Sequence, residues 1–458
     1  MSPETKGERR RIRLQYIFIQ ECFVIFSRFF SRHQLPHWFA GFALILVLSS
    51  CQWTSNFNSQ LVKTPTPLPL PGTPFVDLRG VRQFTDTWNN IHLFQSFDYN
   101  ISDPANVAKH YDFVWGAKVN HVQAIRASNP GIFITYYIPF HREHGTFTDQ
   151  SAIHDLNYWK AVHPDWVLYK CDRVTPAYEF GDPNIPLDFS NPALVPWQIQ
   201  TYALPASESG YDGIAADNVD LQNYYGACGV YVNGKWKQLY TGQYDDPQWR
   251  ADIISWLSRM QQALHHLHHP LALIPNLAIG DLPPDNSIVR LVLNHIDGVL
   301  DEGGFTDYAR GYLTDNKWLQ RIQFMESVQK QHKPYYVVNQ FNSPSIDSRE
   351  IQWTLASYLI GKEHSAAIFI STFQDYGSDT RYFEYDAQIG SPVGGMYQSQ
   401  NVYWRNYSGG LSIVNPSATK TYTVSLNAGN SYVDLHGYAI DQRVTLSPHS
   451  GIVLLTNS

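Results

Sequence analysis

The chain has 458 residues, which is long enough for a barrel of about 250 to 300 residues and one smaller domain. Its formal net charge of −7 gives no basic footprint for nucleic acid, so no partner of that class is expected. The 13 Trp and 29 Tyr residues suit stacking on sugar rings, although a large core with ordinary surface aromatics explains them equally well.

The first fifty residues predict a targeting signal and not a folded domain. Positive charge at residues 9–13 is followed by an apolar run at residues 39–48, which is short for a membrane span and has the length of a signal-peptide core. The sequence Leu48-Ser49-Ser50-Cys51 resembles the bacterial lipobox, in which cleavage precedes a Cys that is then acylated. We therefore expect a lipoprotein signal over residues 1–51 with lipidation at Cys51. An uncleaved membrane helix is the alternative.

The next segment, residues 52–74, is rich in Pro, Ser, Asn and Thr. This composition predicts a semi-extended linker without a core of its own. A lipid anchor followed by such a linker would hold the rest of the chain on the extracellular face of the cell membrane.

From residue 91 onward, strand-like and helix-like stretches alternate. Eight strands separated by helices favour an α/β fold with a (β/α)8 TIM barrel, here over residues 75–384, above an open doubly wound sheet. No Gly-rich phosphate loop follows a predicted strand, which weakens the dinucleotide-binding alternative. The predicted strands are residues 91–97, 111–116, 132–138, the segment ending at Asp217, 271–276, the segment ending at Glu302, 335–339 and 366–372. The predicted helices are residues 104–110, 119–127, 193–204, 247–266, 288–295, 318–330 and 351–359.

The character of the chain changes near residue 385. Short alternating runs at residues 402–404, 410–414, 421–426 and 452–455 are joined by Asn, Gly, Ser and Pro. This pattern predicts a small C-terminal β-sandwich over residues 385–458.

An internal repeat is the most informative pattern. Asp212-Gly213-Ile214-Ala215-Ala216-Asp217 returns as Asp297-Gly298-Val299-Leu300-Asp301-Glu302, so that each copy ends in a carboxylate four residues after Gly. On the fourth and sixth strands of a barrel, Asp217 and Glu302 would face inward at one height of the C-terminal rim. Paired carboxylates at that rim are what hydrolysis of a glycosidic bond requires. An Asp at a strand end that only caps the next helix is the structural alternative.

Other strand ends and loops carry polar or aromatic groups that suit a substrate rich in hydroxyl groups. Singly, each is explained as well by a structural role, and only their convergence on one rim indicates binding. Asp220 lies beyond its strand, and Asp301 points away by parity, so both are second choices for catalysis. The predicted substrate-binding residues are Asp98, Trp115, Tyr136, Tyr137, Asp188, Asp220, Asn276, Asn339, Gln340 and Gln374.

Neither a metal site nor a cofactor is expected. The run His265-His266-Leu267-His268-His269 lies at a predicted helix C-terminus, where His suits the helix dipole, and a catalytic metal needs three convergent ligands. No CxxC or Cys/His zinc spacing occurs. Cys171 and Cys228, the two cysteines after the signal, fit a disulfide of an exported protein and two buried thiols equally well.

Several motifs occur along the chain, and the first two lie in residues 141–192, a long stretch without clear periodicity of the kind that is usually functional. They are His163-Pro164-Asp165-Trp166, Leu187-Asp188-Phe189-Ser190-Asn191-Pro192, Gly210-Tyr211-Asp212-Gly213 leading to Asp217-Asn218, and a tail that includes Gly410-Leu411-Ser412-Ile413-Val414-Asn415-Pro416. With these motifs, residues 75–457 resemble the bacterial glycosidases called hypothetical glycosyl hydrolase family 15-like.

That group is similar to the α-galactosidase-like barrels, whose nucleophile is an Asp on strand four and whose acid/base lies on strand six. Asp217, followed by Asn218, matches the first position, and Glu302 replaces the Asp usual at the second. The resemblance implies a hydrolase fold and a sugar substrate.

From these observations we expect a monomeric, lipid-anchored extracellular glycoside hydrolase of the retaining type that acts on an oligo- or polysaccharide. Asp217 would be the nucleophile or base and Glu302 the general acid. The alternative is a non-catalytic polysaccharide-binding lipoprotein that keeps the barrel as a scaffold. The two hypotheses differ in whether a functional pair of carboxylates is needed.

Overall fold

The computed structural model describes residues 91–457 apart from residues 99, 151–152, 181–183, 278, 280–281 and 364. The predicted signal with Cys51 and the predicted linker at residues 52–74 therefore lie outside the described residues. Within the described part of the chain, none of the helices combines the length and the apolarity that a bilayer crossing requires.

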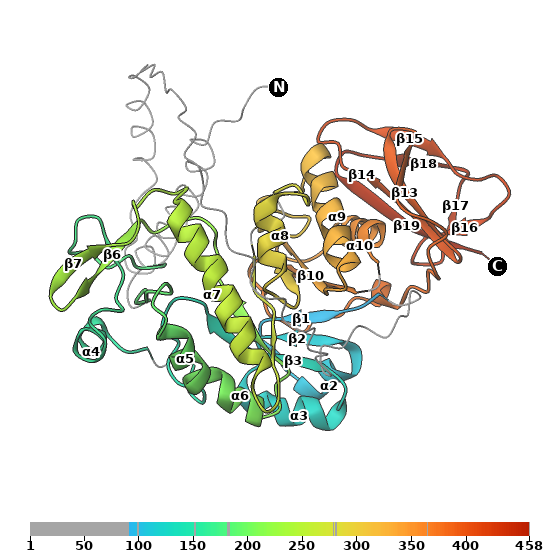
Figure 1. Ribbon diagram of the computed structural model, residues 1–458. Helices are drawn as coiled ribbons and strands as arrows, with labels where there is room; N and C mark the ends of the chain where they lie inside the picture. Colours follow the sequence, from blue (N-terminus) through green and yellow to red (C-terminus); the bar gives the residue numbers. More distant parts are fainter. Residues whose placement is uncertain are drawn as a thin grey trace, which may run out of the picture. The chain divides into compact units, whose positions relative to one another are not determined.

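The first part of the described chain contains a five-stranded and a three-stranded parallel sheet (Figure 1). Isolated parallel bridges of Asn276 with Leu300 and of Leu93 with Ile368 connect the edges of one sheet to the edges of the other. In pairing order the strands are β1 (Phe94–Ser96), β2 (Phe113–Trp115), β3 (Phe133–Pro139), β5 (Gly213–Asp217) and β8 (Ala272–Leu273), then β9 (Val299–Asp301), β10 (Tyr335–Phe341) and β11 (Ala366–Thr372). Each predicted strand has its counterpart in this order.

Helices follow the strands as the sequence predicts, and local capping explains where several of them begin. Asp103 accepts a hydrogen bond from the Asn106 amide at the start of α2, which has Pro104 in its first turn. Asp347 and Glu350 form a capping box at the start of α10. The helices and helical turns of this part are α2 (Pro104–His110), η1 (Val119–His121), α3 (Val122–Ser128), α5 (Leu194–Gln198), the π turn η2 (Ile199–Ala203), α6 (Leu204–Glu208), α7 (Pro247–His265), α8 (Ser287–Leu293), α9 (Asp315–Lys330) and α10 (Ser348–Gly361).

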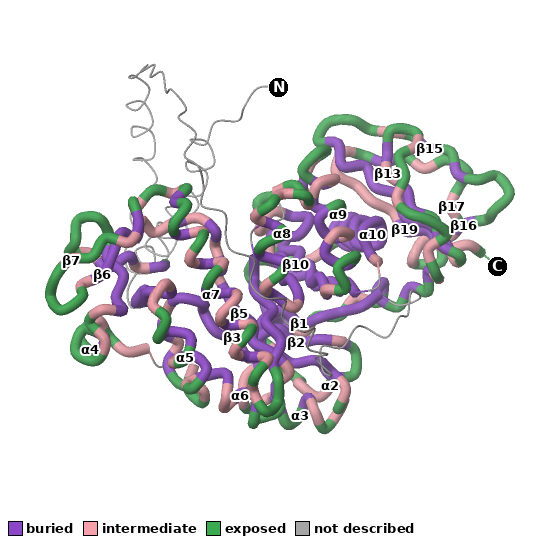
Figure 2. Tube along the Cα trace, in the orientation of Figure 1, coloured by how far each residue is buried: buried purple, intermediate pink, exposed green. Residues whose placement is uncertain are grey.

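Alternation along the strands separates two hydrophobic clusters. Ala215 of β5 belongs to an inner cluster with Trp115, Leu300 and Tyr336, whereas its neighbours Ile214 and Ala216 belong to the larger outer cluster with the helices. Figure 2 shows the parallel strands as a buried layer. The inner cluster is the apolar layer, here called the floor, beneath the side chains at the strand ends.

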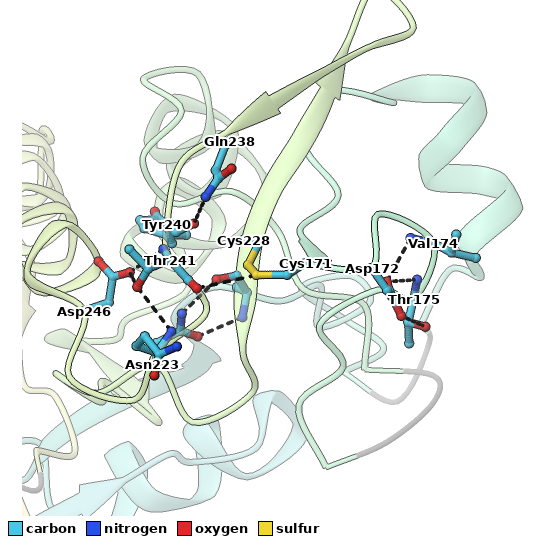
Figure 3. Close-up of a disulfide and its surroundings, with 12 residues drawn as sticks. Cys171, Asp172, Val174, Thr175, Asn223, Cys228, Gln238, Tyr240, Thr241 and Asp246 are labelled. Carbon is cyan, nitrogen blue, oxygen red and sulfur yellow. Dashed lines mark hydrogen bonds between the residues drawn. A yellow bond between two sulfur atoms is a disulfide. The ribbon is translucent and has the colours of Figure 1, made fainter. Parts of the chain in front are cut away.

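The segment between β3 and β5 is more ordered than the sequence suggested. The stretch 141–192, expected to be irregular, contains α4 (Leu156–Val162) and β4 (Tyr169–Lys170). Strand β4 pairs antiparallel with β6 (Ala227–Val232), which forms a hairpin with β7 (Lys235–Gln238). A disulfide between Cys171 and Cys228, with Cα atoms 5.0 Å apart, joins this small sheet (Figure 3).

The last part of the chain, after η3 (Phe383–Asp386), changes to antiparallel strands that pack on each other through a separate apolar cluster. The other face of the larger sheet lies on α10, where Ser412 Oγ donates to the Ala356 carbonyl at 2.9 Å. The predicted sandwich strands are thus present, while the domain limits at residues 384 and 385 stay a prediction. The six-stranded sheet has the order β12 (Tyr397–Ser399), β13 (Val402–Tyr407), β14 (Gly410–Asn415), β19 (Ser450–Thr456), β16 (Tyr432–Val433) and β17 (Ala439–Ile440), and the two-stranded sheet pairs β15 (Tyr422–Ser425) with β18 (Arg443–Leu446).

Candidate active site

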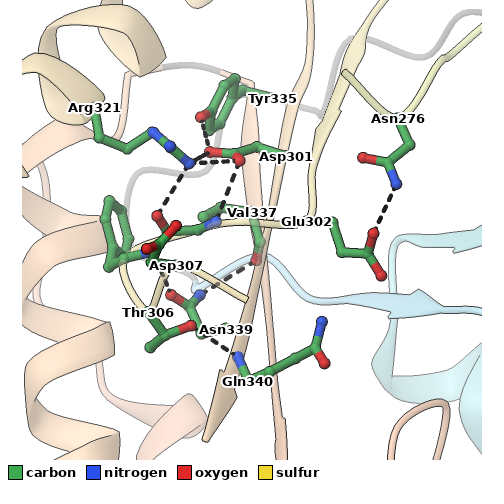
Figure 4. A network of polar contacts seen from close by, with 12 residues as sticks. Asn276, Asp301, Glu302, Thr306, Asp307, Arg321, Tyr335, Val337, Asn339 and Gln340 are labelled. Atoms are coloured by element: carbon green, nitrogen blue, oxygen red, sulfur yellow. Dashed lines mark hydrogen bonds and ion pairs between the residues drawn. The ribbon is translucent and has the colours of Figure 1, made fainter. Parts of the chain in front are cut away.

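One amide links the two repeat strands. Nδ2 of Asn276, just beyond β8, donates to Asp217 Oδ1 at 2.9 Å and to Glu302 Oε2 at 2.8 Å (Figure 4 shows the second bond). Because both bonds share one nitrogen, the two carboxylate oxygens cannot be farther apart than the sum of 2.9 and 2.8 Å. The structure therefore brings together Asp217, Glu302 and Asn276 at the carboxyl ends of neighbouring strands.

Strand parity separates Glu302 from the adjacent carboxylate. Asp301 is 3% exposed and lies on the outer side of β9, where Arg321 Nη1 is 2.6 Å from each of its oxygens and the Tyr335 hydroxyl donates to it. In Figure 4 the side chains of Asp301 and Glu302 leave the strand in opposite directions. Asp301 is thus neutralised by its own partners, and the expectation that it points away from the pair is confirmed.

Asp217 is surrounded by hydrogen-bond donors. Besides Asn276, the Tyr137 hydroxyl donates to Asp217 Oδ2 at 2.8 Å, and Asn218 Nδ2 donates to the same oxygen at 3.3 Å. An ionised carboxylate can only accept hydrogen bonds, so these groups suit a charged side chain at this position. They also fix the direction in which its oxygens point.

Glu302 has a different environment. Burial, and after it the neighbouring charge of Asp217, together raise the pKa of Glu302 to about 7, against the hydrogen bonds from Asn276 and Tyr376 that lower it. A carboxyl group with this pKa carries a proton over much of the neutral range. The pair thus combines one carboxylate held by donors with one carboxyl group able to give up a proton, which is the division of roles that general acid catalysis needs.

Aromatic rings form the floor beneath the pair. Trp115 is fully buried, donates from Nε1 to the Ile274 carbonyl at 3.0 Å, and meets the Tyr137 ring edge-on at 5.9 Å between centroids. Phe97 contacts both of these rings and the ring of Tyr376 at 4.7 to 5.5 Å. These contacts hold the hydroxyls of Tyr137 and Tyr376 beside Asp217 and Glu302.

Left-handed backbone follows the strand ends at this site. Phe97, after β1, has φ 54°, Asn218, after Asp217, has φ 58°, and Tyr308, after Glu302, has φ 57°. Such angles are uncommon for residues other than Gly, and unusual for bulky ones. At Phe97 the turn places the ring in the aromatic floor, which links this strained backbone to the arrangement of the site.

Some of the predicted substrate-binding residues lie at the pair. Tyr137 and Asn276 bond to it directly, and Trp115 lies in the floor. Asp220 is close enough for its charge to raise the pKa of Glu302, although less than burial and Asp217 do. Gln340 follows Tyr336 and Val338 along the inner face of β10.

The structure does not bring the other predicted residues to the pair. Tyr136 packs in the outer cluster against Phe147, because it has the opposite parity to Tyr137. Asp98 accepts from the backbone of Lys118 and bonds His121 at 2.7 Å. Asp188 accepts from Ser190, Asn339 accepts from the Phe305 amide, and Gln374 is exposed to solvent.

Two residues at the site were missed from the sequence. The Tyr376 hydroxyl bonds Glu302 and lies 2.9 Å from Ser96 Oγ. Arg142 pairs with the buried Glu179 at 2.7 Å and is near enough to Asp217 for that charge to act on it. Tyr376 lies only two residues after Gln374, so including the tyrosines that follow the last predicted strand would have identified it.

His265, the first residue of the histidine run, has a structural role. His265 Nε2 bonds Asp297 Oδ2 at 2.9 Å at the end of α7, and Asp297 also accepts from the Leu273 amide at 2.8 Å. Over the described residues, no group of three or more His, Cys, Asp or Glu side chains is arranged to hold a metal ion.

Comparison with solved structures gives distant likenesses. An α-amylase from Malbranchea cinnamomea is 10% identical over 81% of this chain and 97% of that one, with a TM-score of 0.43. A type III pullulan hydrolase from Thermococcus kodakarensis is 12% identical over 80% and 75%, with a TM-score of 0.44. The GH36 α-galactosidase AgaA from Geobacillus stearothermophilus is 10% identical over 81% and 56%, with a TM-score of 0.41. At these values the likenesses support no conclusion about substrate. No curated protein matches the chain.

Comparison with family models gives a clear result. The model described as hypothetical glycosyl hydrolase family 15 matches residues 126–411. This range is more than half of the chain and contains Asp217, Asn276 and Glu302. The chain therefore belongs to hypothetical glycosyl hydrolase family 15 and is a glycoside hydrolase.

Proposed function

We propose that the protein cleaves the glycosidic bond of an extracellular oligo- or polysaccharide by a retaining mechanism, with Asp217 as nucleophile and Glu302 as general acid and base. The observation that carries this proposal is the Asn276 amide shared by the two carboxyl groups. The upper limit that it sets on the separation of two oxygens lies below the roughly 6.5 to 9.5 Å typical of inverting pairs. A short separation of the two carboxyl groups favours direct attack by Asp217 over attack by an activated water.

In the first step, the Glu302 carboxyl gives its proton to the glycosidic oxygen while Asp217 attacks the anomeric carbon. The bond to the leaving group breaks, and a glycosyl ester of Asp217 forms. In the second step, Glu302, now a carboxylate, takes a proton from water as that water attacks the same carbon and releases Asp217. The raised pKa of Glu302, about 7, suits a group that must both donate and accept a proton.

Asn276 and Tyr137 are positioning residues in this scheme. Both donate to Asp217, and Asn276 also donates to Glu302. These bonds keep the two carboxyl groups in one relative orientation while Asp217 forms its ester and Glu302 loses its proton. When Asp217 loses its charge in the ester, the pKa of Glu302 falls, because the second largest cause of its elevation is removed. This change favours the switch of Glu302 from acid to base.

We further propose that the eight parallel strands form a closed (β/α)8 barrel over residues 75–384, followed by the sandwich at residues 385–458. The bridges at Asn276 and Leu93 support closure because they join both pairs of sheet edges. The position of the carboxylates at the strand C-termini agrees with where such barrels keep their chemistry.

A non-catalytic carbohydrate-binding lipoprotein is favoured less. A binding protein gains nothing from a carboxyl group whose pKa is raised to about 7 beside a second carboxylate, since like charges at this distance oppose each other. Family membership also supports hydrolysis.

We also propose that Cys51 is acylated and anchors a monomer to the outer face of the membrane. The disulfide between Cys171 and Cys228 supports an exported protein, because disulfides persist in oxidising compartments. Mass analysis of protein from membrane fractions should find an N-terminal diacyl or triacyl Cys. A soluble product that retains residues before Cys51 would rule the anchor out.

The catalytic proposal is tested by hydrolysis of a panel of oligosaccharides and aryl glycosides. Wild-type protein should release sugar from at least one member, and the double variant Asp217→Ala/Glu302→Gln, purified in parallel, should not. Equal release by both preparations would mean that the activity comes from a contaminant or another site. Time-resolved ¹H NMR of the first product should show the anomer of the substrate, and the opposite anomer would refute retention.

A further inference from the structure

The C-terminal sandwich carries a second feature that suits a sugar. A cleft of about 430 Å³ lies between strands of the six-stranded sheet and the segment 425–430. This volume lies within the range of small-ligand pockets, which is about 300 to 1,000 Å³. We propose that this cleft binds a stretch of uncharged glycan, independently of the catalytic pair.

The chemical character of the lining supports an uncharged partner. Among the described residues that line the cleft, none is Asp, Glu, Lys, Arg or His. Instead, the lining combines aromatic rings with amide and hydroxyl groups, from Tyr397, Gln400, Trp404, Asn406, Asn430 and Tyr432. Rings pack against the apolar faces of sugar rings, and amides pair with sugar hydroxyls, whereas a charged ligand would find no opposite charge here.

The aromatic part is accessible. Tyr397 is 42% exposed, and its ring lies nearly parallel to that of the buried Trp404, with an interplanar angle of 12° and centroids 6.4 Å apart. The buried ring supports the exposed one from within the sheet. Tyr397 thus lines the cleft with an accessible aromatic ring.

The cleft is held in shape before any ligand binds. Asn406 Nδ2 donates to the Tyr397 hydroxyl at 3.2 Å, and Asn430 Nδ2 donates to the Tyr432 hydroxyl at 3.1 Å. Gln400, at the turn of the β12–β13 hairpin, bonds the Ser425 backbone twice, at 2.8 and 3.1 Å. These bonds fix both walls, so little conformational entropy is lost on binding.

The site also differs from the catalytic pair in what it can do. Its lining offers no carboxyl group in the described residues, so it has no acid or nucleophile for cleavage. Its expected role is to keep a long glycan on the protein surface. A second contact point on the same chain raises the effective concentration of substrate for the first.

The test is native electrophoresis of the purified full chain in gels cast with soluble starch, pullulan, galactomannan, xylan or, as an anionic comparison, pectate. At least one uncharged polysaccharide should slow the wild-type protein. Tyr397→Ala and Asn406→Ala should each weaken that retention about tenfold in Kd, since each removes a ring or an amide from the cleft. Tyr438→Ala is the matched control, because Tyr438 is 71% exposed in the same sandwich and does not line the cleft.

Slower migration in the gel does not depend on hydrolysis. The binding proposal can therefore hold where the catalytic proposal fails, and the catalytic proposal can hold where the binding proposal fails. The inference is overturned if no uncharged polysaccharide slows the protein, if pectate alone does, or if the cleft variants are retained as strongly as wild type. Asn430→Ala serves as a further cleft variant, and unchanged thermal unfolding of each variant shows that a loss of retention reflects the cleft and not the fold.

Discussion

The two faces of strand β9 give the clearest contrast in the molecule. On the outer face, Asp301 is locked between Arg321 and Tyr335, and its charge is matched by its partners. On the inner face, Glu302 shares an amide with a second carboxyl group, and its pKa is raised to about 7. Adjacent residues of one strand thus have opposite electrostatic surroundings. Alternation along the strand places Asp301 beside the cation Arg321 and Glu302 beside the like charge of Asp217.

The contrast separates stability from catalysis. Removing one partner of a buried ion pair strongly destabilises the fold, because the remaining charge is left buried without compensation. A carboxyl group beside a like charge is costly to ionise in the fold, and groups of this kind cluster at functional sites. Substitutions on the outer face should change stability, and those on the inner face should change turnover.

The largest effect is expected on turnover. Glu302→Gln should lower kcat/KM by about 10²- to 10⁴-fold for substrates with poor leaving groups, and Asp217→Ala by at least as much, because each removes a group that acts in the transition state. Steady-state kinetics on the best glycoside measures this, and urea unfolding should show wild-type stability or better. Near-native turnover in either variant would remove that residue from the catalytic pair.

On the outer face, Asp301→Asn should destabilise the fold by about 3 to 5 kcal/mol, because it leaves the Arg321 charge buried at 5% exposure without its carboxylate. Urea unfolding followed by tryptophan fluorescence gives the free energy of unfolding. At temperatures where the variant is folded, its kcat should remain within about tenfold of wild type. A stable but inactive Asp301→Asn protein would contradict the division between the two faces.

The inner face should also set the pH response of stability. The folded-state pKa of Glu302, about 7, lies above its ordinary value of 4.5, so the folded state binds the proton more tightly than the unfolded state does. The resulting stabilisation is fully present below pH 4.5 and is lost as pH rises to about 7. Glu302→Gln lacks this loss and should be more stable than wild type at pH 8 by about 1 to 3 kcal/mol. If the difference in free energy of unfolding between wild type and Glu302→Gln were the same at pH 4.5 and at pH 8, the raised pKa of Glu302 would be contradicted.

The smallest expected effect concerns the hydrogen bond to Glu302. Tyr376→Phe removes a bond that lowers the pKa of Glu302, so the alkaline limb of the kcat/KM profile should move to higher pH, with a loss of less than about tenfold at the optimum. A pH–rate profile checks the shift. Tyr382→Phe, which changes a half-buried tyrosine elsewhere, is the control and should leave the limb in place. A shift to lower pH would mean that Tyr376 acts in another way.

The sequence was sufficient where strand periodicity decides the outcome. The repeat ending at Asp217 and Glu302 placed both carboxylates on inner faces. Asn276 and Tyr137 were predicted as polar groups at strand ends, and both bond to the pair. Tyr136 and Tyr137 were both predicted for the site, although alternation permits only one of them to face inward.

Beyond the strand ends, local backbone geometry decides, and the sequence pattern carries less information. Phe97 turns the chain through a left-handed conformation, and Asp98 after it bonds Lys118 and His121, which follow β2. After β11 the chain exposes Gln374 and returns Tyr376 to the site. The β6–β7 hairpin was missed although Asn233-Gly234, with positive φ at both residues, is a strong hairpin signal.

The central claim is that Asp217 attacks the sugar and Glu302 moves the proton, and azide can test both roles at once. With an aryl glycoside that the wild type hydrolyses, azide should rescue Glu302→Ala by attacking the glycosyl ester of Asp217, giving a glycosyl azide of the same anomeric configuration as the substrate. Azide should rescue Asp217→Ala by occupying the space of the lost nucleophile, giving the opposite configuration. ¹H NMR of the two isolated azides decides: these two outcomes support the assignment, and exchanged or identical configurations would contradict it.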